Sequence, residues 1–182
     1  MSQRRPGLPG DPNPAATIER MIRVDHAGEY GAARIYAGQL AVLRRSPSAG
    51  VLQEMAAQEQ VHLDAFAELV VQRQVRPTAL LPLWHVIGFA LGAATAALGE
   101  RAAMACTVAI EEAIDAHYAG QIEALDDSEA ELCGTIARFR DEELHHRDLA
   151  VEHGARQAPG YRLLYTAIKA GCRIAIAASE RL

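Results

Sequence analysis

Residues 58–62 read QEQVH, and residues 139–146 read FRDEELHH. In both stretches a glutamate stands three positions before a histidine, within a segment whose apolar residues recur at helical spacing. Side chains three positions apart lie on the same face of a helix, so each pair can offer one oxygen and one nitrogen to a single metal ion. The sequence therefore contains the same half of a metal site twice. The two pairs are Glu59 with His62 and Glu143 with His146.

One further glutamate precedes each pair at nearly the same distance. Glu29 stands 30 residues before Glu59. In the second copy, Glu111 stands 32 residues before Glu143. All of these side chains fall within apolar helical stripes, where an uncompensated carboxylate costs several kcal/mol. Two divalent cations would offset four carboxylates, and neutral imidazoles would complete their coordination. The predicted metal ligands are Glu29, Glu59, His62, Glu111, Glu143 and His146.

This ligand set predicts the fold. A glutamate from each of two helices and a Glu-x-x-His pair from each of two others is the arrangement of ferritin-like di-iron and di-manganese bundles. Half of the chain is hydrophobic but only 5% is aromatic, and breaks containing Pro, Gly or Asp leave six helix-sized segments. We expect an all-α protein, with a ferritin-like four-helix bundle, a long apolar crossover helix and an additional C-terminal helix. Residues 1–14, with four prolines, are predicted to be a flexible arm, and residues 15–182 a single domain.

Other polar residues near the six predicted ligands fall into two groups. Asp25 and Asp115 share the phase of the apolar stripes, and we expect them to hydrogen-bond metal-bound histidines and fix their orientation. Three residues lie off that phase and are predicted to be outer groups. They are Glu112, Glu142 and His145.

Charge and cysteine content exclude several classes of protein. The formal net charge is -5 and the 18 basic residues are scattered, which is unlike a nucleic-acid-binding protein and disfavours a tRNA hydroxylase of similar fold. The three cysteines include no CxxC pair, which predicts reduced thiols in a reducing compartment. The first residues lack the apolar stretch of a secretory signal, so a cytoplasmic location is expected.

Residues 79–99, ALLPLWHVIGFALGAATAALG, carry no formal charge and are long enough for a transmembrane helix. A membrane span here would leave the two halves of the metal site on opposite sides of the bilayer. We therefore predict a crossover that runs the length of the bundle, because the helices before and after it must be parallel. Its apolar surface would be buried against the bundle or in a homo-oligomer, or would lie in a membrane surface.

The last segment, residues 161–179, is also apolar and has three basic residues interleaved, a pattern suited to anionic lipid headgroups. With the crossover, it favours peripheral association with the membrane over burial, and a lipophilic substrate would be the reason. The basic residues are Arg162, Lys169 and Arg173.

Four strings resemble the demethoxyubiquinone hydroxylase family of ubiquinone biosynthesis. The similarity covers roughly residues 17–182, and the six predicted ligands match that family's metal positions. The resemblance implies a ferritin-like fold, an iron centre and a peripheral membrane protein. The strings are VDHAGEYGA (24–32), ACTVAIEEAIDAHY (105–118), FRDEELHHRDLAVEHGA (139–155) and AGCRIAIAASERL (170–182).

The activity that this resemblance implies is an O2-dependent di-iron monooxygenase. It would use two Fe2+ ions to hydroxylate the ring of a demethoxy-polyprenyl benzoquinol, with electrons from NADH or from the quinol. His117 and Tyr118 follow Glu111 by six and seven residues, about two helical turns, and are predicted to position substrate or to relay electrons and protons, with a structural Tyr118 as the alternative. An accessory lipid-binding protein is a further expected partner.

Two other functions fit the same ligand set. A ferritin-like iron-oxidising or storage protein must assemble a soluble cage and would have no use for a 21-residue uncharged crossover. A scaffold with a purely structural metal site would fold with zinc and consume no O2.

Overall fold

The computed structural model describes residues 13–182, and within them it contains six α-helices, two short 3-10 turns and no β-strand. The prediction of an all-α protein is confirmed. The predicted arm lies outside the described residues except for Asn13, which caps the first helix, and Pro14, which begins it. The helices are α1 (Pro14–Leu43), α2 (Ala49–Gln72), α3 (Leu81–Ala97), α4 (Glu100–Ala124), α5 (Ala130–Glu152) and α6 (Tyr161–Ser179), and the 3-10 turns are Asp127–Glu129 and Ala155–Gln157.

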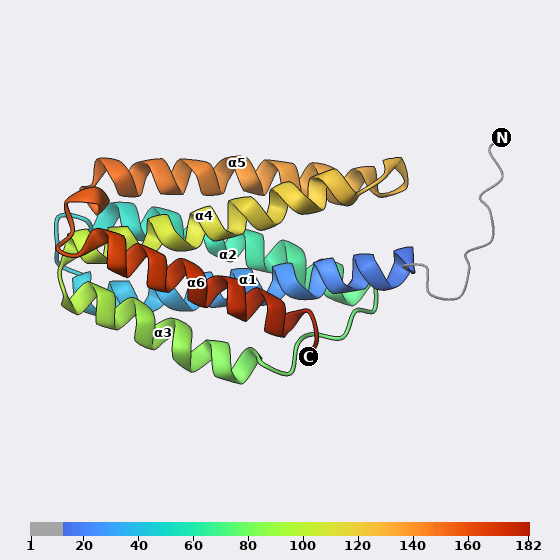
Figure 1. The fold of residues 1–182 in the computed structure, drawn as a ribbon, viewed down its shortest axis with the longest axis horizontal. Coiled ribbons are helices and arrows are strands. Elements are labelled where there is room, and N and C mark those ends of the chain that lie inside the picture. The colour runs from blue at the N-terminus through green and yellow to red at the C-terminus, as the bar shows by residue number, and fades with distance from the viewer. Residues whose placement is uncertain (1–12) are drawn as a thin grey trace.

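Helices α1 and α2 form one antiparallel pair, and α4 and α5 form another (Figure 1). Together they make the four-helix bundle. Helix α3 lies between the two pairs in the sequence and runs back along the bundle, so that α2 and α4 point in the same direction (Figure 1). The predicted crossover is confirmed. The helix is slightly shorter than the apolar segment, because it begins beside Pro82 and ends before Gly99, whose φ is 112°.

The crossover packs directly on the backbone of α1. A Cβ added to Gly92 would collide with the carbonyl of Ile35, and one added to Gly38 would collide with the carbonyl of Phe89. Glycine at these positions lets α1 and α3 approach more closely than any side chain would allow. Helix α6 packs in turn against α4, so α3 and α6 form an outer layer on the bundle (Figure 1).

The apolar core is divided into two clusters. One contains Leu52, Met55 and Met104, and the other contains Phe66 and Phe139. The predicted stripes of α2 and α5 are confirmed, because the buried residues of these helices recur three and four positions apart through the glutamates and histidines.

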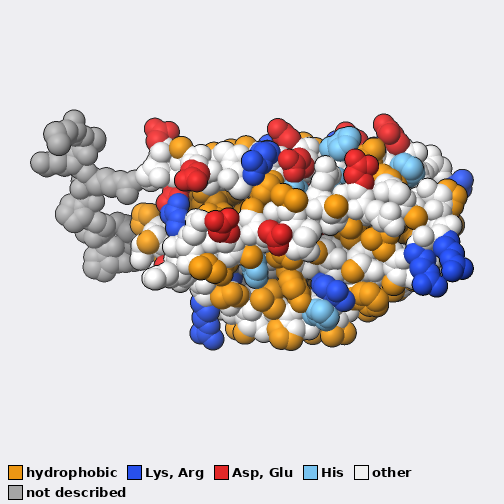
Figure 2. Space-filling model, turned by 180° about the vertical axis from the view of Figure 1, so that it is seen from behind, with side chains coloured by type: hydrophobic (Ala, Val, Ile, Leu, Met, Phe, Trp, Pro, Cys, Tyr) orange, Lys and Arg blue, Asp and Glu red, His pale blue; other side chains and the backbone are white. Residues whose placement is uncertain are grey.

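The outer layer leaves large apolar side chains in contact with solvent. Val86 on α3 is 64% exposed, and Leu163 and Ile174 on α6 are 78% and 70% exposed. Figure 2 shows hydrophobic side chains gathered along the edge of the molecule where α3 lies. None of the helices within residues 13–182 combines the length and apolar character that crossing a bilayer requires.

Candidate metal centre

Four helices bring the six predicted ligands to one place in the bundle interior. Helices α1 and α4 each supply one glutamate, and α2 and α5 each supply a Glu-x-x-His pair. All six side chains are at most 1% exposed. The structure thus brings together every residue that the sequence predicted to hold metal, while their role as ligands stays a prediction.

The six side chains form two overlapping groups of four. The first group contains Glu29 and His62, the second contains Glu111 and His146, and Glu59 and Glu143 belong to both. Within each group the potential ligand atoms lie within 4.8 Å of one another. Two metal ions side by side would therefore share the two glutamates of the Glu-x-x-His pairs, and each would have one histidine and one further glutamate to itself.

Several atoms of this cluster are buried without any hydrogen-bond partner. They are five carboxylate oxygens and one imidazole nitrogen, in a molecule whose buried polar groups are expected to be paired. Carboxylate and imidazole groups that face one another without donors between them are suited to a divalent cation. The residues present therefore fit a metal cofactor. The atoms are Glu29 Oε2, both side-chain oxygens of Glu59, Glu111 Oε2, Glu143 Oε2 and His146 Nδ1.

The electrostatics of the cluster also favour positive charge. Burial, reinforced by Glu143 and Glu111, raises the pKa of Glu59 well above its ordinary value. Burial opposes the charged form of His62 as well, but hydrogen bonds with Glu143 and Glu29 outweigh it and raise the pKa of His62 to about 11. The electrostatics of the cluster therefore favour a cation there, either a proton on imidazole or a metal ion.

Two tyrosines hold the glutamates that are not shared. The Tyr36 hydroxyl donates to Oε1 of Glu111 at 2.6 Å, and the Tyr118 hydroxyl donates to Oε1 of Glu29. In both glutamates Oε2 is left without a hydrogen-bond partner. Each tyrosine therefore fixes one oxygen of a carboxylate and leaves the other free to bind metal.

The predicted roles of two aspartates were wrong. Asp25 accepts hydrogen bonds from His117 at 3.2 Å and from Gln121 at 2.7 Å, and neither is a predicted ligand. Asp115 accepts a hydrogen bond from Arg140 at 2.7 Å. Helical phase placed both aspartates near the interior, but it does not tell which side chain of a facing helix they meet.

The side chains that do contact the two histidines come from positions just before the shared glutamates. His62 Nε2 donates to Glu142 at 2.6 Å, and His146 Nε2 donates to Gln58 at 2.5 Å. Glu142 is an outer group, as predicted. The other two predicted outer residues also lie outside the cluster, but neither contacts a ligand: His145 is exposed, and Glu112 contacts α6.

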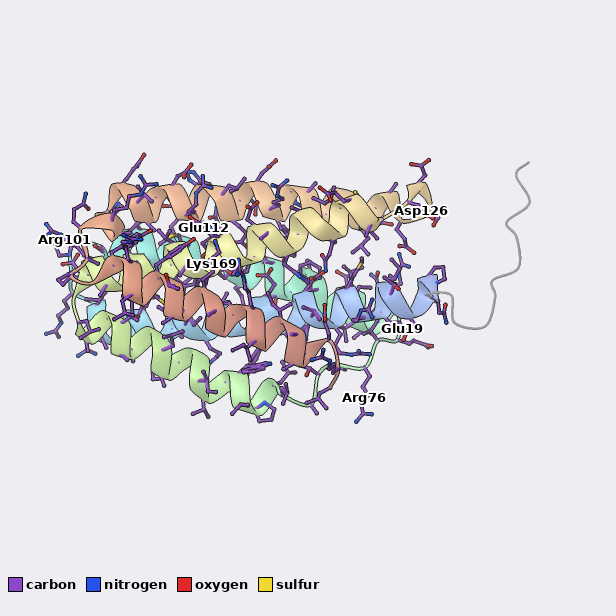
Figure 3. The ribbon with its side chains drawn as sticks, viewed as in Figure 1. Glu19, Arg76, Arg101, Glu112, Asp126 and Lys169 are labelled. Atoms are coloured by element: carbon purple, nitrogen blue, oxygen red, sulfur yellow. The ribbon has the colours of Figure 1, made fainter. Side chains whose placement is uncertain are left out.

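Lys169 on α6 also differs from its expected role. Its ammonium group donates to Glu112 on α4 at 2.7 Å, and Tyr165 donates to the same carboxylate oxygen (Figure 3). The prediction that Lys169 faces lipid headgroups was wrong, because its charge is paired within the protein and ties α6 to α4.

An apolar cavity of about 600 Å³ lies between α1, α3, α4 and α6. It runs beside the metal cluster, since Gly28 and Ile110 in its lining are the sequence neighbours of Glu29 and Glu111. Its lining includes small residues such as Ala32 and Ala113. The cavity offers space for an elongated apolar molecule.

Residues 16–179 match the model of one protein family, described as Ubiquinone biosynthesis protein COQ7. The chain belongs to this family. It is 63% identical, over 96% of its length and 83% of the relative's, to the 3-demethoxyubiquinol 3-hydroxylase of Rhodospirillum rubrum. It is 54% identical, over 98% of its length and 84% of the relative's, to the NADPH-dependent 3-demethoxyubiquinone 3-hydroxylase, mitochondrial, of Homo sapiens. The 5-demethoxyubiquinone hydroxylase, mitochondrial, of Saccharomyces cerevisiae is 42% identical over 92% of the chain and 79% of that protein.

Membership of the COQ7 family confirms the resemblance inferred from the four sequence strings. The relatives are named as hydroxylases, and nothing in the comparisons supports iron storage. Two polar residues of the centre, Gln58 and Tyr36, were given no role from the sequence. A signal for Tyr36 was present, because it follows Glu29 by seven residues, as Tyr118 follows Glu111.

Proposed function

We propose that this COQ7-family chain is an O2-dependent di-iron monooxygenase of ubiquinone biosynthesis that hydroxylates the ring of a demethoxy-polyprenyl benzoquinol. The observation that carries the proposal is the buried cluster of six carboxylate and imidazole side chains with unpaired oxygens directed at one another. The names of the relatives supply the substrate class. Residues 15–182 form the single domain that performs the reaction.

Six side chains would hold two Fe2+ ions. One ion would be held by Glu29 and His62 and the other by Glu111 and His146, with Glu59 and Glu143 shared. Iron bound there supplies the capacity to activate O2 for attack on an electron-rich ring. The protein's own contribution is to keep water away, since every one of these side chains is at most 1% exposed.

The apolar cavity would hold the polyprenyl tail. Its lining includes Ile35, Leu91 and Ile168 from three different helices, and burial of isoprene units against such side chains is favourable by about 25 cal/mol per Å² of apolar surface. His117 and Tyr118 are on the same helix as Glu111, and we assign to them the positioning of the ring or the passage of protons and electrons. His117 suits an outer position in this path because it is 19% exposed, whereas Tyr118 is buried.

Hydroxylation consumes O2, two electrons and two protons, and leaves one oxygen atom in the product and one in water. The electrons would come from NADH, from NADPH, which the name of the human relative includes, or from the quinol itself. Comparing turnover with NADH, with NADPH and with the quinol alone in the same protein preparation decides among the three.

The outer layer would attach the protein to the cytoplasmic face of a membrane. Leu163, Ile174 and Val86 expose apolar surface that water does not favour, and Arg162 and Arg173 on α6 would face anionic headgroups. The same surface would receive an accessory lipid-binding protein or a second copy of this chain when the protein leaves the bilayer.

The test is anaerobic loading with Fe2+, followed by 18O-labelled O2, a reductant and a short-chain demethoxyquinol. Mass analysis should find one labelled oxygen atom in the product. Glu143→Ala removes a shared carboxylate and should abolish the product, whereas Glu152→Ala, an exposed change on the same helix, should not. A product that persisted in Glu143→Ala would show that this centre is not the catalyst. A protein that folded with zinc and consumed no O2 when loaded with Fe2+ would favour the structural scaffold.

A further inference from the structure

The metal centre is built from two copies of one pattern. Along the sequence, Glu111 and Tyr118 on α4 each follow their counterparts on α1, Glu29 and Tyr36, by 82 positions. On α5, the Glu-x-x-His pair follows that of α2 by 84 positions. The hydrogen bonds repeat as well, since each tyrosine donates to the glutamate of the other copy.

The copies also match further along the helices. Gln39 on α1 donates to Thr107 on α4 at 3.4 Å, and Gln121 on α4 donates to Asp25 on α1 at 2.7 Å. Gln121 follows Gln39 by 82 positions, and Thr107 follows Asp25 by the same distance, so the two hydrogen bonds are equivalent. Two halves related in this way offer two metal positions that are alike in geometry and in the number of carboxylates.

The copies differ in charge at Asp25 and Thr107, neither of which hydrogen-bonds a predicted ligand, and at the residues that contact the histidines from outside. In each copy the residue just before the shared glutamate accepts a hydrogen bond from the histidine of the other copy. For His62 that residue is Glu142, a carboxylate that is 37% exposed, and for His146 it is Gln58, a neutral amide. The positions correspond, but the charges do not.

The direction of both hydrogen bonds is set by chemistry. A carboxylate oxygen and an amide oxygen only accept, so Nε2 of each histidine carries the proton. In a neutral ring the lone pair is then on Nδ1, which lies toward the glutamates: His62 Nδ1 is 3.0 Å from Glu143, and His146 Nδ1 is 3.1 Å from Glu59. Both outer partners prepare the imidazole to bind metal, and only Glu142 does so with a negative charge.

We propose that Glu142 makes the two metal positions unequal, so that the position with His62 binds the first ion and the position with His146 binds the second. A carboxylate that accepts from a coordinated imidazole makes the ring a stronger ligand, and loss of such a partner lowers metal affinity about 10- to 100-fold. An amide oxygen polarises the ring less than a carboxylate does. This inference rests on the metal centre of the proposed function and is independent of the hydroxylation.

The experiment is an anaerobic titration of the metal-free protein with Fe2+ alone, and separately with Co2+ alone. Calorimetry measures the binding of each metal, and the visible spectrum of Co2+ reports its coordination. The wild type should bind two ions in two steps whose affinities differ about tenfold or more. His146→Ala should keep the tighter step, and His62→Ala should lose it.

Exchange of the two outer residues gives the sharpest test. Glu142→Gln alone should weaken the tighter step about 10- to 100-fold, so that the two steps merge. Glu142→Gln combined with Gln58→Glu should reverse the order of binding. When His62→Ala is added to this double variant, the tighter step should survive, and when His146→Ala is added instead, it should be lost. Glu152→Gln makes the same change of charge at an exposed position of α5 and should alter neither step.

The outcomes separate this inference from the function on which it rests. Two ions bound with equal affinity by the wild type, or a tighter step unchanged in Glu142→Gln, would overturn the inequality and leave the centre intact. A protein that bound neither Fe2+ nor Co2+ would overturn the centre, and the proposed monooxygenase with it.

Discussion

The bundle interior and the outer layer distribute polar and apolar groups in opposite ways. Inside, where side chains should be apolar, Glu59, Glu143 and His62 are fully buried. Outside, where they should be polar, Leu163 and Val86 are 78% and 64% exposed. Each inversion is unfavourable in water without a partner, and the partners we propose are a cation inside and an apolar phase outside. These two partners are the ones that the proposed function requires, because it brings metal chemistry to a lipid-soluble substrate.

The largest expected effect concerns the inner partner. Two bound divalent ions should raise the free energy of unfolding by about 4 kcal/mol each when the free ion is present at 1,000 times its dissociation constant. Denaturant unfolding with Fe2+ under anaerobic conditions, and again after chelation, measures the difference. An unfolding curve that does not respond to chelation would mean that the buried carboxylates are stabilised by something other than metal.

The second prediction concerns pH: the metal-free protein should lose stability as pH rises, whereas the additional stability conferred by metal should grow. Glu59 and Glu111 have a folded-state pKa raised above the ordinary 4.5, so the metal-free folded state binds more protons than the unfolded state. Its stability should therefore fall as pH rises above about 4.5, by up to about 1.4 kcal/mol per pH unit for each such proton. His62, whose pKa is raised to about 11, extends the loss above pH 6.5.

Metal binding displaces these protons, so the stabilisation by Fe2+ should grow with pH over the same interval. Unfolding curves at several pH values, with and without the ion, should diverge as pH rises. Parallel curves would contradict the assignment of the protons to the metal-binding side chains.

The sequence predicted the interior better than its surroundings for a physical reason. The six predicted ligands lie on helical stripes, and phase along one helix is a local property that Glu59 and His62 reveal directly. The partner of His62 is Glu142, whose identity depends on how α5 is rotated and shifted against α2. Lys169 was misassigned for the same reason, since only the packing of α6 on α4 brings it to Glu112.

The third prediction concerns the contact that joins the two regions. Gly92→Ala places a methyl group against the carbonyl of Ile35 and should destabilise the protein by about 1–3 kcal/mol as α3 is pushed away from α1. Gly120→Ala is the control, because a Cβ there meets nothing within 4 Å and should stabilise α4 by about 0.5–1 kcal/mol. Denaturant unfolding compares the two variants. If Gly92→Ala were as stable as the wild type, the close approach of α3 to α1 would not hold in solution.

The smallest expected effect tests the outer partner. Leu163→Ser removes one exposed apolar side chain from α6 and should weaken binding to vesicles of mixed neutral and anionic phospholipid about three- to tenfold, equivalent to roughly 1 kcal/mol. Val71→Ser is the matched control, because Val71 is 76% exposed but lies on α2, away from the outer layer. Cosedimentation with the vesicles measures both, and iron content should be unchanged in each variant. Equal losses in the two variants would mean that any exposed apolar residue contributes to binding, whereas a loss confined to Leu163→Ser assigns the membrane contact to the face that covers the apolar cavity.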